Sequence, residues 1–131
     1  MIVVDTHVWV WWINQDSRLT PAEVALLRGH EDDAIGVPAI CLWEIALLTG
    51  KGRLSLATPT EEWLDAALLY PGMRLLPLTP AISVDSVGLP GDFHKDPADR
   101  LIVATARVHS SPLLTHDAAI IDYAHVLHAS P

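Results

Sequence analysis

The chain has 131 residues, a formal net charge of −8 at pH 7 and a single cysteine. This length fits one domain over residues 1–131, which should bury roughly 70% of the surface that the unfolded chain exposes. The lone Cys41 excludes an internal disulfide, no apolar run approaches the roughly 20 residues of a transmembrane helix, and Asp5 comes too early for a signal peptide. We therefore expect a soluble, cytoplasmic protein. The negative charge argues at face value against nucleic-acid binding, because phosphates attract lysine and arginine.

Strand and helix patterns alternate from the start of the chain. MIVVD (residues 1–5) is a β-branched run typical of a buried strand, and it ends on a carboxylate. Residues 6–14 then carry tryptophans at helical spacing. A second helix is predicted over residues 21–28, because Thr20-Pro21-Ala22-Glu23 combines a capping box with proline at the first helical position. Residues 34–37 are the next strand candidate.

The third helix contains an isolated carboxylate. Pro38 opens this helix, and Gly50 and Gly52 close it. Within CLWEIALLTGKG, the first eight residues are apolar except for Glu44. We expect the helix to be buried on most sides, so that Glu44 must reach solvent or meet a positive partner. A single polar position usually marks only the solvent face of a helix, so Glu44 alone does not define a site.

The rest of the chain continues the alternation. The elements predicted there are a helix over 60–68, a strand over 73–78, a helix over 80–89, a helix over 100–108 after the loop LPGDFHKDPAD, a strand over 112–115 and a short strand over 125–128. Thr60 should cap the first of these helices, and Asp85 should lie exposed. Strands alternating with helices predict a parallel sheet covered on both faces. Ligands of such sheets bind at the carboxyl ends of the strands.

Carboxylates recur where that edge is expected. Asp5 ends the first strand, and Asp117 lies two residues beyond the strand over 112–115. Asp96 and Asp99 are three residues apart at the start of a helix, which places them at neighbouring positions of one face. The sequence therefore predicts that these acids approach one another at one edge of the sheet.

Four blocks of the sequence resemble a known family. MIVVDTH, LWEIALLTGKGRL, HKDPADRLIVATA and LLTHD are similar to the corresponding blocks of PIN-domain ribonucleases, closest to the VapC-type toxins of bacterial toxin–antitoxin pairs. The match runs in order from Ile2 to about Tyr123. It implies a three-layer α/β/α sandwich around a mostly parallel sheet, dependence on Mg²⁺ or Mn²⁺, cleavage of RNA, a homodimer and neutralisation by a small VapB-like antitoxin.

The resemblance also implies roles for individual residues. The catalytic, metal-binding acids of the family fall, in chain order, on Asp5, Glu44, Asp99 and Asp117. Because HKDPADR offers two aspartates, Asp96 stays open as a metal ligand, and Asp99 is aligned because DRLIVATA best fits the family helix. Thr6 and Thr115 match positions where a hydroxyl usually accompanies the acids, and we place them among the substrate-binding residues.

The chemistry of the acids is consistent with a metal site. Carboxylates brought together repel one another and raise some of their pKa values unless a cation lies among them. Oxygen ligands without paired cysteines suit Mg²⁺ or Mn²⁺ better than Zn²⁺. One or two such ions can polarise a phosphodiester and lower the pKa of a bound water. We expect Asp5 and Asp99 to be the main ligands, with Glu44 and Asp117 completing the site directly or through waters.

The charge objection weakens once these acids are set apart. Without Asp5, Glu44, Asp96, Asp99 and Asp117, the net charge changes from −8 to −3. Four basic residues lie close in sequence to the acids and are candidates for binding RNA phosphates, namely Lys51, Arg53, Lys95 and Arg100. Solvated surface charge is an equally good interpretation of any one of them.

Alternatives remain open for the aromatic residues and for the function. The run VWVWWI (residues 8–13) holds three tryptophans that could stack bases, but packing or a partner contact is the stronger interpretation. A catalytically silent interaction module would keep the fold without turnover. A phosphorelay receiver also has an acidic Mg²⁺ edge, yet it needs an aspartate after its central strand, where MRLLPLTP ends in Thr79-Pro80.

Overall fold

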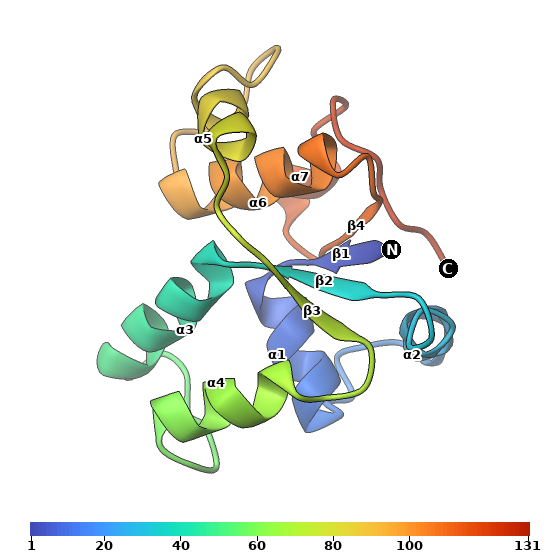
Figure 1. The fold of residues 1–131 in the computed structure, drawn as a ribbon, viewed down its shortest axis with the longest axis vertical. Coiled ribbons are helices and arrows are strands. Elements are labelled where there is room, and N and C mark those ends of the chain that lie inside the picture. Colours follow the sequence, from blue (N-terminus) through green and yellow to red (C-terminus); the bar gives the residue numbers. More distant parts are fainter.

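The computed structural model describes residues 1–131 as seven helices and a four-stranded sheet. The elements are β1 (Ile2–Val4), α1 (Thr6–Asn14), α2 (Pro21–Arg28), β2 (Ile35–Pro38), α3 (Ile40–Gly50), α4 (Thr60–Leu68), β3 (Met73–Leu76), α5 (Pro80–Val87), α6 (Pro97–Val108), β4 (Leu113–Leu114) and α7 (Ala118–Ile121). Figure 1 shows α5, α6 and α7 on one side of the sheet and α1, α3 and α4 on the other. This is the predicted α/β/α arrangement.

The sheet is parallel throughout, with the strand order β3-β2-β1-β4. Every residue of β1, β2 and β4 is buried, as expected for parallel strands covered on both faces. From β1 the chain adds β2 and β3 on one side and β4 on the other, so the direction of growth reverses between β1 and β4. Ligands of open α/β sheets bind at such a reversal, outside the carboxyl ends of the strands.

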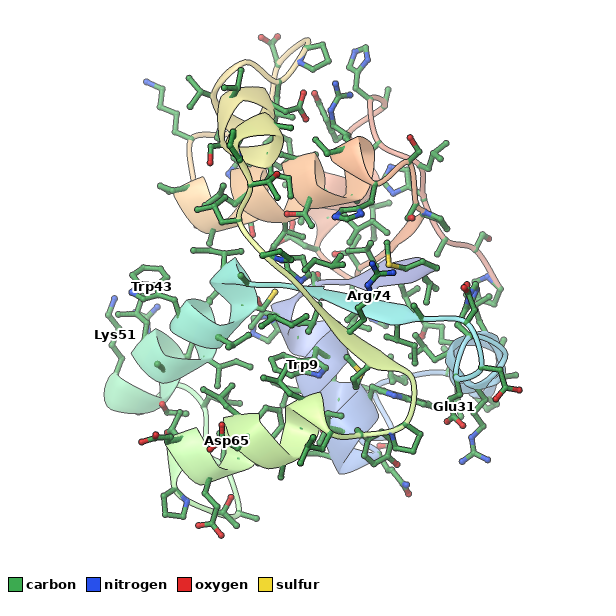
Figure 2. All side chains as sticks on the ribbon, viewed as in Figure 1. Trp9, Glu31, Trp43, Lys51, Asp65 and Arg74 are labelled. Atoms are coloured by element: carbon green, nitrogen blue, oxygen red, sulfur yellow. The ribbon has the colours of Figure 1, made fainter.

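The first two helices follow directly from the sequence. The capping box of α2 is formed, because the Glu23 backbone donates to Thr20 Oγ1 at 3.1 Å and the Thr20 backbone donates to Glu23 Oε1 at 2.9 Å. In α1, Trp9 and Trp12 are buried, and the Trp9 ring meets Trp63 of α4 edge to face at 5.6 Å. Trp9 lies inside the molecule, below the sheet in Figure 2. Packing is therefore the role of two of the three clustered tryptophans.

Several predicted boundaries were wrong. Pro59 rather than Thr60 occupies the N-cap of α4, and the Thr60 hydroxyl donates to Thr49 Oγ1 at 3.0 Å. β3 ends two residues early, at Leu76, and it is an edge strand, so the predicted central position of MRLLPLTP was also wrong. α6 begins at Pro97 instead of residue 100, because Asp96 caps it. Local patterns fixed the type of these elements better than their ends.

Two further expectations about secondary structure need correction. The helix α7 was not predicted, since its four residues are too few to display helical periodicity. Residues 125–128 form no strand of their own and contribute only an isolated parallel bridge between Leu113 and His128. No helix of the structure combines the length and apolar composition that a membrane span requires.

The helix α3 is less buried than its composition indicates. Only Cys41 and Ile45 of this helix are buried, while Trp43 is 57% exposed. The expectation that α3 is enclosed on most sides was therefore wrong. One edge of α3 packs on the core and the other faces outward, which leaves Glu44 half-buried between them.

Candidate active site

A pocket of about 380 Å³ is lined by residues that follow β1 and β4 and by residues of α3 and α6. It therefore lies at the carboxyl-terminal edge of the sheet, where the strand order reverses. Five carboxylates line it, contributed by Asp5, Glu44, Asp96, Asp99 and Asp117. The structure thus brings together all four acids aligned with the family and the alternative aspartate. We call this set the acidic pocket.

Asp5 is the most deeply placed of these acids, with 6% of the residue exposed. It caps α1, where the Val8 backbone donates to its Oδ1 at 3.0 Å, and the Thr115 hydroxyl donates to its Oδ2 at 2.5 Å. Burial raises the pKa of Asp5 despite these hydrogen bonds. Thr115 Oγ1 also accepts the backbone N–H of Asp117 at 3.0 Å. The Thr115 hydroxyl therefore ties the acid after β1 to the acid after β4.

Glu44 faces the acidic pocket rather than open solvent. Its Oε1 accepts a hydrogen bond from the Thr6 hydroxyl, which belongs to the first turn of α1. α1 and α3 pack beside each other, so residues 38 positions apart in sequence meet here. Glu44 interrupts an apolar run because it lies on the edge of α3 that lines the pocket. Both threonines that accompany the acids donate to carboxylates.

The start of α6 supplies the remaining pair of acids. Asp96 caps this helix, and its Oδ1 accepts the backbone N–H groups of Ala98 at 2.9 Å and Asp99 at 3.2 Å. Asp99 Oδ2 lies 3.1 Å from His94 Nε2. Burial, followed by repulsion from the other four acids of the pocket, raises the pKa of Asp99 to about 7. The Asp99 carboxyl is therefore destabilised in its charged form by burial first and by the neighbouring acids second.

Asp117 lies at the exposed rim of the pocket. It caps the short helix α7, and its Oδ1 accepts the backbone N–H groups of Ala119 at 2.9 Å and Ile120 at 3.3 Å. Asp5, Asp96 and Asp117 thus each use Oδ1 to cap a helix, so that Oδ2 takes no part in the cap. The hydrogen bonds of such a cap hold the carboxylate in one orientation.

No lysine or arginine lines the acidic pocket. Lys51 follows the C-terminus of α3 (Figure 2), about 10 Å along the helix axis from Glu44 at 1.5 Å per residue. Arg53 lies just beyond it and is exposed. Lys95 and Arg100 line a different cavity, next to α5. None of the four basic residues singled out in the sequence therefore lines the acidic pocket.

Arg100 makes several hydrogen bonds within the protein. Its guanidinium donates to four backbone carbonyls, those of Ser86, Val87, Phe93 and His94, at 2.8–3.2 Å. These bonds fasten the loop before α6 to the end of α5. The charge of Arg100 is therefore committed to holding the loop that delivers Asp96 and Asp99.

His7, Ile102 and His116 line the pocket but were not singled out from the sequence, and Trp11 was considered for base stacking but assigned first to packing or a partner. His7 and Trp11 are four residues apart, a spacing that places them on one face of a helix. This helix begins directly after Asp5. That spacing, and the position of His116 beside Asp117 in LLTHD, are the signals that could have found the two histidines. The pairing of His116 with Glu23, at 2.7 Å between Nε2 and Oε2, leaves no mark on the sequence.

The donor set of the acidic pocket fits a divalent cation. All five acids offer oxygen ligands, which Mg²⁺ and Mn²⁺ prefer. Burial and mutual repulsion raise the pKa of Asp99, and a bound cation would relieve both where no lysine or arginine lines the pocket. No group of three His, Cys, Asp or Glu side chains is close enough to chelate an ion unaided. Waters would complete the coordination, as is usual for Mg²⁺.

Fold and site together define a class of protein: an α/β/α domain with a carboxylate pocket at the strand-order reversal of a parallel sheet. The chain belongs to the PIN domain family, whose model matches residues 2–126. It is 36% identical over 124 residues to Ribonuclease VapC22 of Mycobacterium tuberculosis, which covers 95% of this chain and 92% of that protein. The family resemblance predicted from the sequence is confirmed.

Solved structures from three bacteria share the fold. VapBC2 from Rickettsia felis bound to a DNA fragment from the promoter has a TM-score of 0.71 at 17% identity, over 98% of both chains. FitAcB from Neisseria gonorrhoeae has a TM-score of 0.68 at 23% identity, over 99% of this chain and 97% of that one. A toxin–antitoxin complex from Klebsiella pneumoniae has a TM-score of 0.64 at 15% identity, over 97% and 96%. These likenesses establish the fold.

Proposed function

We propose that the protein is a Mg²⁺- or Mn²⁺-dependent endoribonuclease that acts in the cytoplasm as the toxin of a toxin–antitoxin pair. The observation that carries the proposal is the acidic pocket itself, in which five carboxylates converge without a lysine or arginine. Membership of the PIN domain family and the similarity to a protein named Ribonuclease VapC22 support the choice of RNA as substrate.

The proposed reaction is hydrolysis of a phosphodiester bond. A bound divalent ion would polarise the phosphodiester and lower the pKa of an attacking water. Asp5 and Asp99 are the main ligands in this proposal, with Glu44 and Asp117 completing the site and Asp96 as an additional candidate. Burial of Asp5 and the raised pKa of Asp99 favour a partner of positive charge at these two positions.

The two threonines of the site donate hydrogen bonds to two of the acids. Thr6 holds one oxygen of Glu44 and Thr115 holds one oxygen of Asp5, so each fixes the orientation of a proposed ligand. Lys51, Arg53 and Lys95 lie outside the pocket and are proposed to contact the RNA backbone as it extends away from the cut. Arg100 is left out of this set, because backbone carbonyls already occupy its guanidinium.

The proposed partners are a VapB-like antitoxin and a second copy of the chain. Similar folds occur in structures described as VapBC2 and as a toxin–antitoxin complex, which supports an antitoxin partner. The rival function is a catalytically silent PIN module that binds a partner. A phosphorelay receiver is set aside because the chain belongs to the PIN domain family.

Cleavage of a mixed, structured RNA pool tests the proposal. The purified protein is incubated with Mg²⁺, with Mn²⁺ and with chelator, beside a Glu44→Gln variant of unchanged fold. We expect cutting that depends on the metal and is lost in the variant. Absence of cutting with either metal, in a folded protein that binds the product of a neighbouring antitoxin gene, would favour the silent module.

A further inference from the structure

The acidic pocket has a second wall that carries no carboxylate. It consists of His7, Trp11 and His116, which we call the aromatic wall. His7 and Trp11 are one turn apart on α1, with 6.1 Å between ring centroids. His116 follows β4 and meets Trp11 edge to face, at 5.0 Å between centroids and 81° between planes. The three rings therefore form one continuous surface that faces the same space as the acids.

The aromatic wall is held in place from behind. His116 Nε2 lies 2.7 Å from Oε2 of Glu23, a residue that is 7% exposed. The other oxygen of Glu23 accepts the Thr20 backbone in the capping box of α2. Burial alone would raise the pKa of Glu23, but the hydrogen bonds from Thr20 and His116 lower it, so the carboxylate stays charged beside the imidazole. A ring anchored in this way is preorganised for contact with a ligand.

Trp11 differs from the neighbouring tryptophans of its helix. Trp9 and Trp12 are buried in the core, whereas Trp11 is half-buried and lines the pocket. The Arg18 guanidinium carbon lies over the Trp11 ring, 5.4 Å from its centroid, which adds positive charge next to this ring. Trp11 therefore packs partly against the core and presents the rest of its ring to the pocket.

The pocket is larger than an ion alone requires. A cation with six waters fills about 200 Å³ at about 30 Å³ per water, against a cavity of about 380 Å³. The pocket therefore has room beside a hydrated ion, and the aromatic wall is part of its lining. Aromatic rings attract nucleobases of any sequence by stacking, and ring nitrogens of histidine can hydrogen-bond the edges of bases.

We propose that the aromatic wall is the subsite for the nucleobase next to the scissile phosphate of the RNA. This inference rests on the proposed ribonuclease function. Trp11 is the stacking surface, while His7 and His116 contact the edge of the base and set the preference for nucleotides beside the cut. The carboxylates of the acidic pocket then act on the phosphate, and the aromatic wall positions the base.

The test compares oligonucleotides that have or lack the base in question. Cut sites of the wild type are mapped on a random single-stranded RNA pool with Mg²⁺. Oligonucleotides spanning a cut site are then made with the natural base or with an abasic ribose on either side of the cut. Dissociation constants with Ca²⁺ and kcat/KM with Mg²⁺ are measured for the wild type, Trp11→Leu and Trp11→Phe. Trp43→Leu is the matched control, because Trp43 is exposed on α3 and does not line the pocket.

Stacking predicts a distinctive pattern of results. Trp11→Leu should weaken binding about 5- to 100-fold, and Trp11→Phe should recover most of that loss, since phenylalanine keeps a stacking face. The difference between wild type and Trp11→Leu should vanish on the oligonucleotide that lacks the stacked base. Trp43→Leu should retain the full contribution of the base. His116→Leu should change which nucleotides flank the cuts.

Several outcomes would overturn the inference. If the wild type cuts RNA but loses nothing when the base is removed on either side, the subsite is wrong and the ribonuclease function stands. Equal losses in Trp11→Leu and Trp11→Phe, or unchanged RNA binding with loss of the complex with the antitoxin, would assign Trp11 to packing or to the partner. If the wild type cuts no RNA with either metal, the proposed function fails and the subsite beside a scissile phosphate fails with it. Binding of homopolymer RNA that depends on Trp11 would then show a stacking surface without a nuclease.

Discussion

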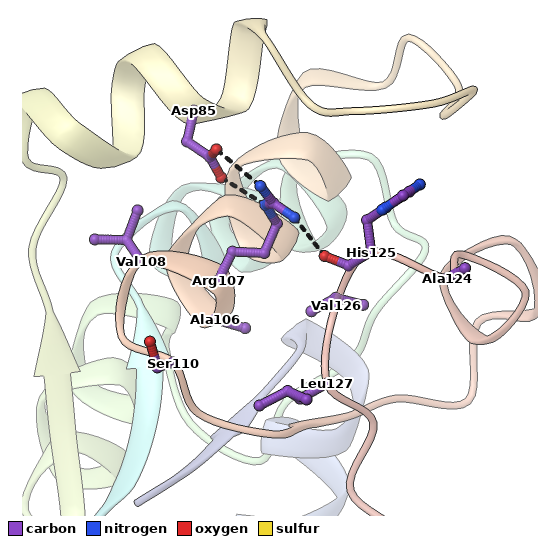
Figure 3. Close-up of a pocket in the computed structure, with 9 residues that line it drawn as sticks. All are labelled: Asp85, Ala106, Arg107, Val108, Ser110, Ala124, His125, Val126 and Leu127. Atoms are coloured by element: carbon purple, nitrogen blue, oxygen red, sulfur yellow. Dashed lines mark hydrogen bonds and ion pairs between the residues drawn. The ribbon is translucent and has the colours of Figure 1, made fainter.

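The acidic pocket and the Asp85–Arg107 pair show two ways in which this chain places carboxylates. Asp85 of α5 accepts hydrogen bonds from Arg107 of α6, at 2.9 Å from Nε and 3.3 Å from Nη2, and Arg107 also donates to the carbonyl of His125 (Figure 3). This hydrogen-bonded partner raises the pKa of Arg107. The acidic pocket instead gathers five carboxylates without a lysine or arginine.

The difference distinguishes an acid that stabilises the fold from acids that are available to bind a cation. Asp85 is complete within the protein, so its contribution is to hold α5 against α6. None of the acids of the pocket is paired with a lysine or arginine, so a bound cation would balance charge that the protein leaves largely uncompensated. Perturbed pKa values of this kind are characteristic of functional sites.

The largest effect is expected on catalysis. Asp5→Asn should lower metal-dependent RNA cleavage by about 100-fold or more, since the metal supplies several kcal/mol to the transition state. Asp85→Asn is the matched control, because it neutralises an acid that the protein pairs internally. Its cleavage rate per folded molecule should equal that of the wild type. Equal losses in both variants would mean that the contrast between the two regions does not concern catalysis.

The next effect concerns the hydroxyl that orients Asp5. Thr115→Val keeps the shape of the side chain but removes the bond to Asp5 and the acceptor for the Asp117 backbone. We expect Mn²⁺ affinity to fall about 10- to 100-fold, as for other residues that support metal ligands. Titration calorimetry measures this directly. Affinity within twofold of the wild type would show that Thr115 does not orient a ligand.

The metal-free protein should lose stability as the pH rises. Asp99 has a pKa of about 7 in the folded protein against 3.8 as the ordinary value, and the pKa of Asp5 is raised as well. The folded state therefore holds these protons more tightly, so their stabilising effect is full below about pH 4 and is lost as the pH rises to about 7. Urea unfolding in chelator at pH 5, 6, 7 and 8 should show the decline. Mg²⁺ should flatten it, and Asp99→Asn should reduce it.

The smallest effect is on the stability of the metal-free protein, which should change in opposite directions in Asp85→Asn and Asp99→Asn. Asp85→Asn should destabilise the metal-free protein by about 1 kcal/mol, because it weakens a partly exposed ion pair. Asp99→Asn should instead stabilise the metal-free protein at pH 8, because it removes repulsion among the acids. Thermal unfolding in chelator resolves both shifts, which should be a few degrees in opposite directions. Shifts of the same sign would contradict the contrast.

The sequence revealed the parts of the site that depend on local pattern. Asp5 and Asp117 could be placed because each follows an apolar run, and parallel strands end at a common edge. The capping box of α2 was readable for the same reason, since all of its bonds lie within four residues. The resemblance to PIN domains added Glu44, which no periodicity of α3 distinguishes from a solvent-facing residue.

The parts that could not be predicted depend on contacts between distant segments. The carbonyls that occupy Arg100 come from two separate segments, and Asp85, expected to be exposed, finds its partner 22 residues away. The pairing of His116 with Glu23 joins residues 93 positions apart. In each case the side chain has a partner that only the folded chain brings near. The two histidines of the aromatic wall were missed although they lie close to Asp5 and Asp117 in sequence, while base stacking by Trp11 was weighed and ranked below packing.

Direct binding of Mn²⁺ tests most sharply whether the acidic pocket is completed from outside. Calorimetric titration with Mn²⁺ is carried out at pH 7.5 on the wild type, Asp99→Asn and Asp85→Asn. We predict saturable binding to the wild type and to Asp85→Asn with equal affinity, and loss of binding in Asp99→Asn. Absence of binding to the wild type at millimolar Mn²⁺, or binding that survives in Asp99→Asn, would contradict the account.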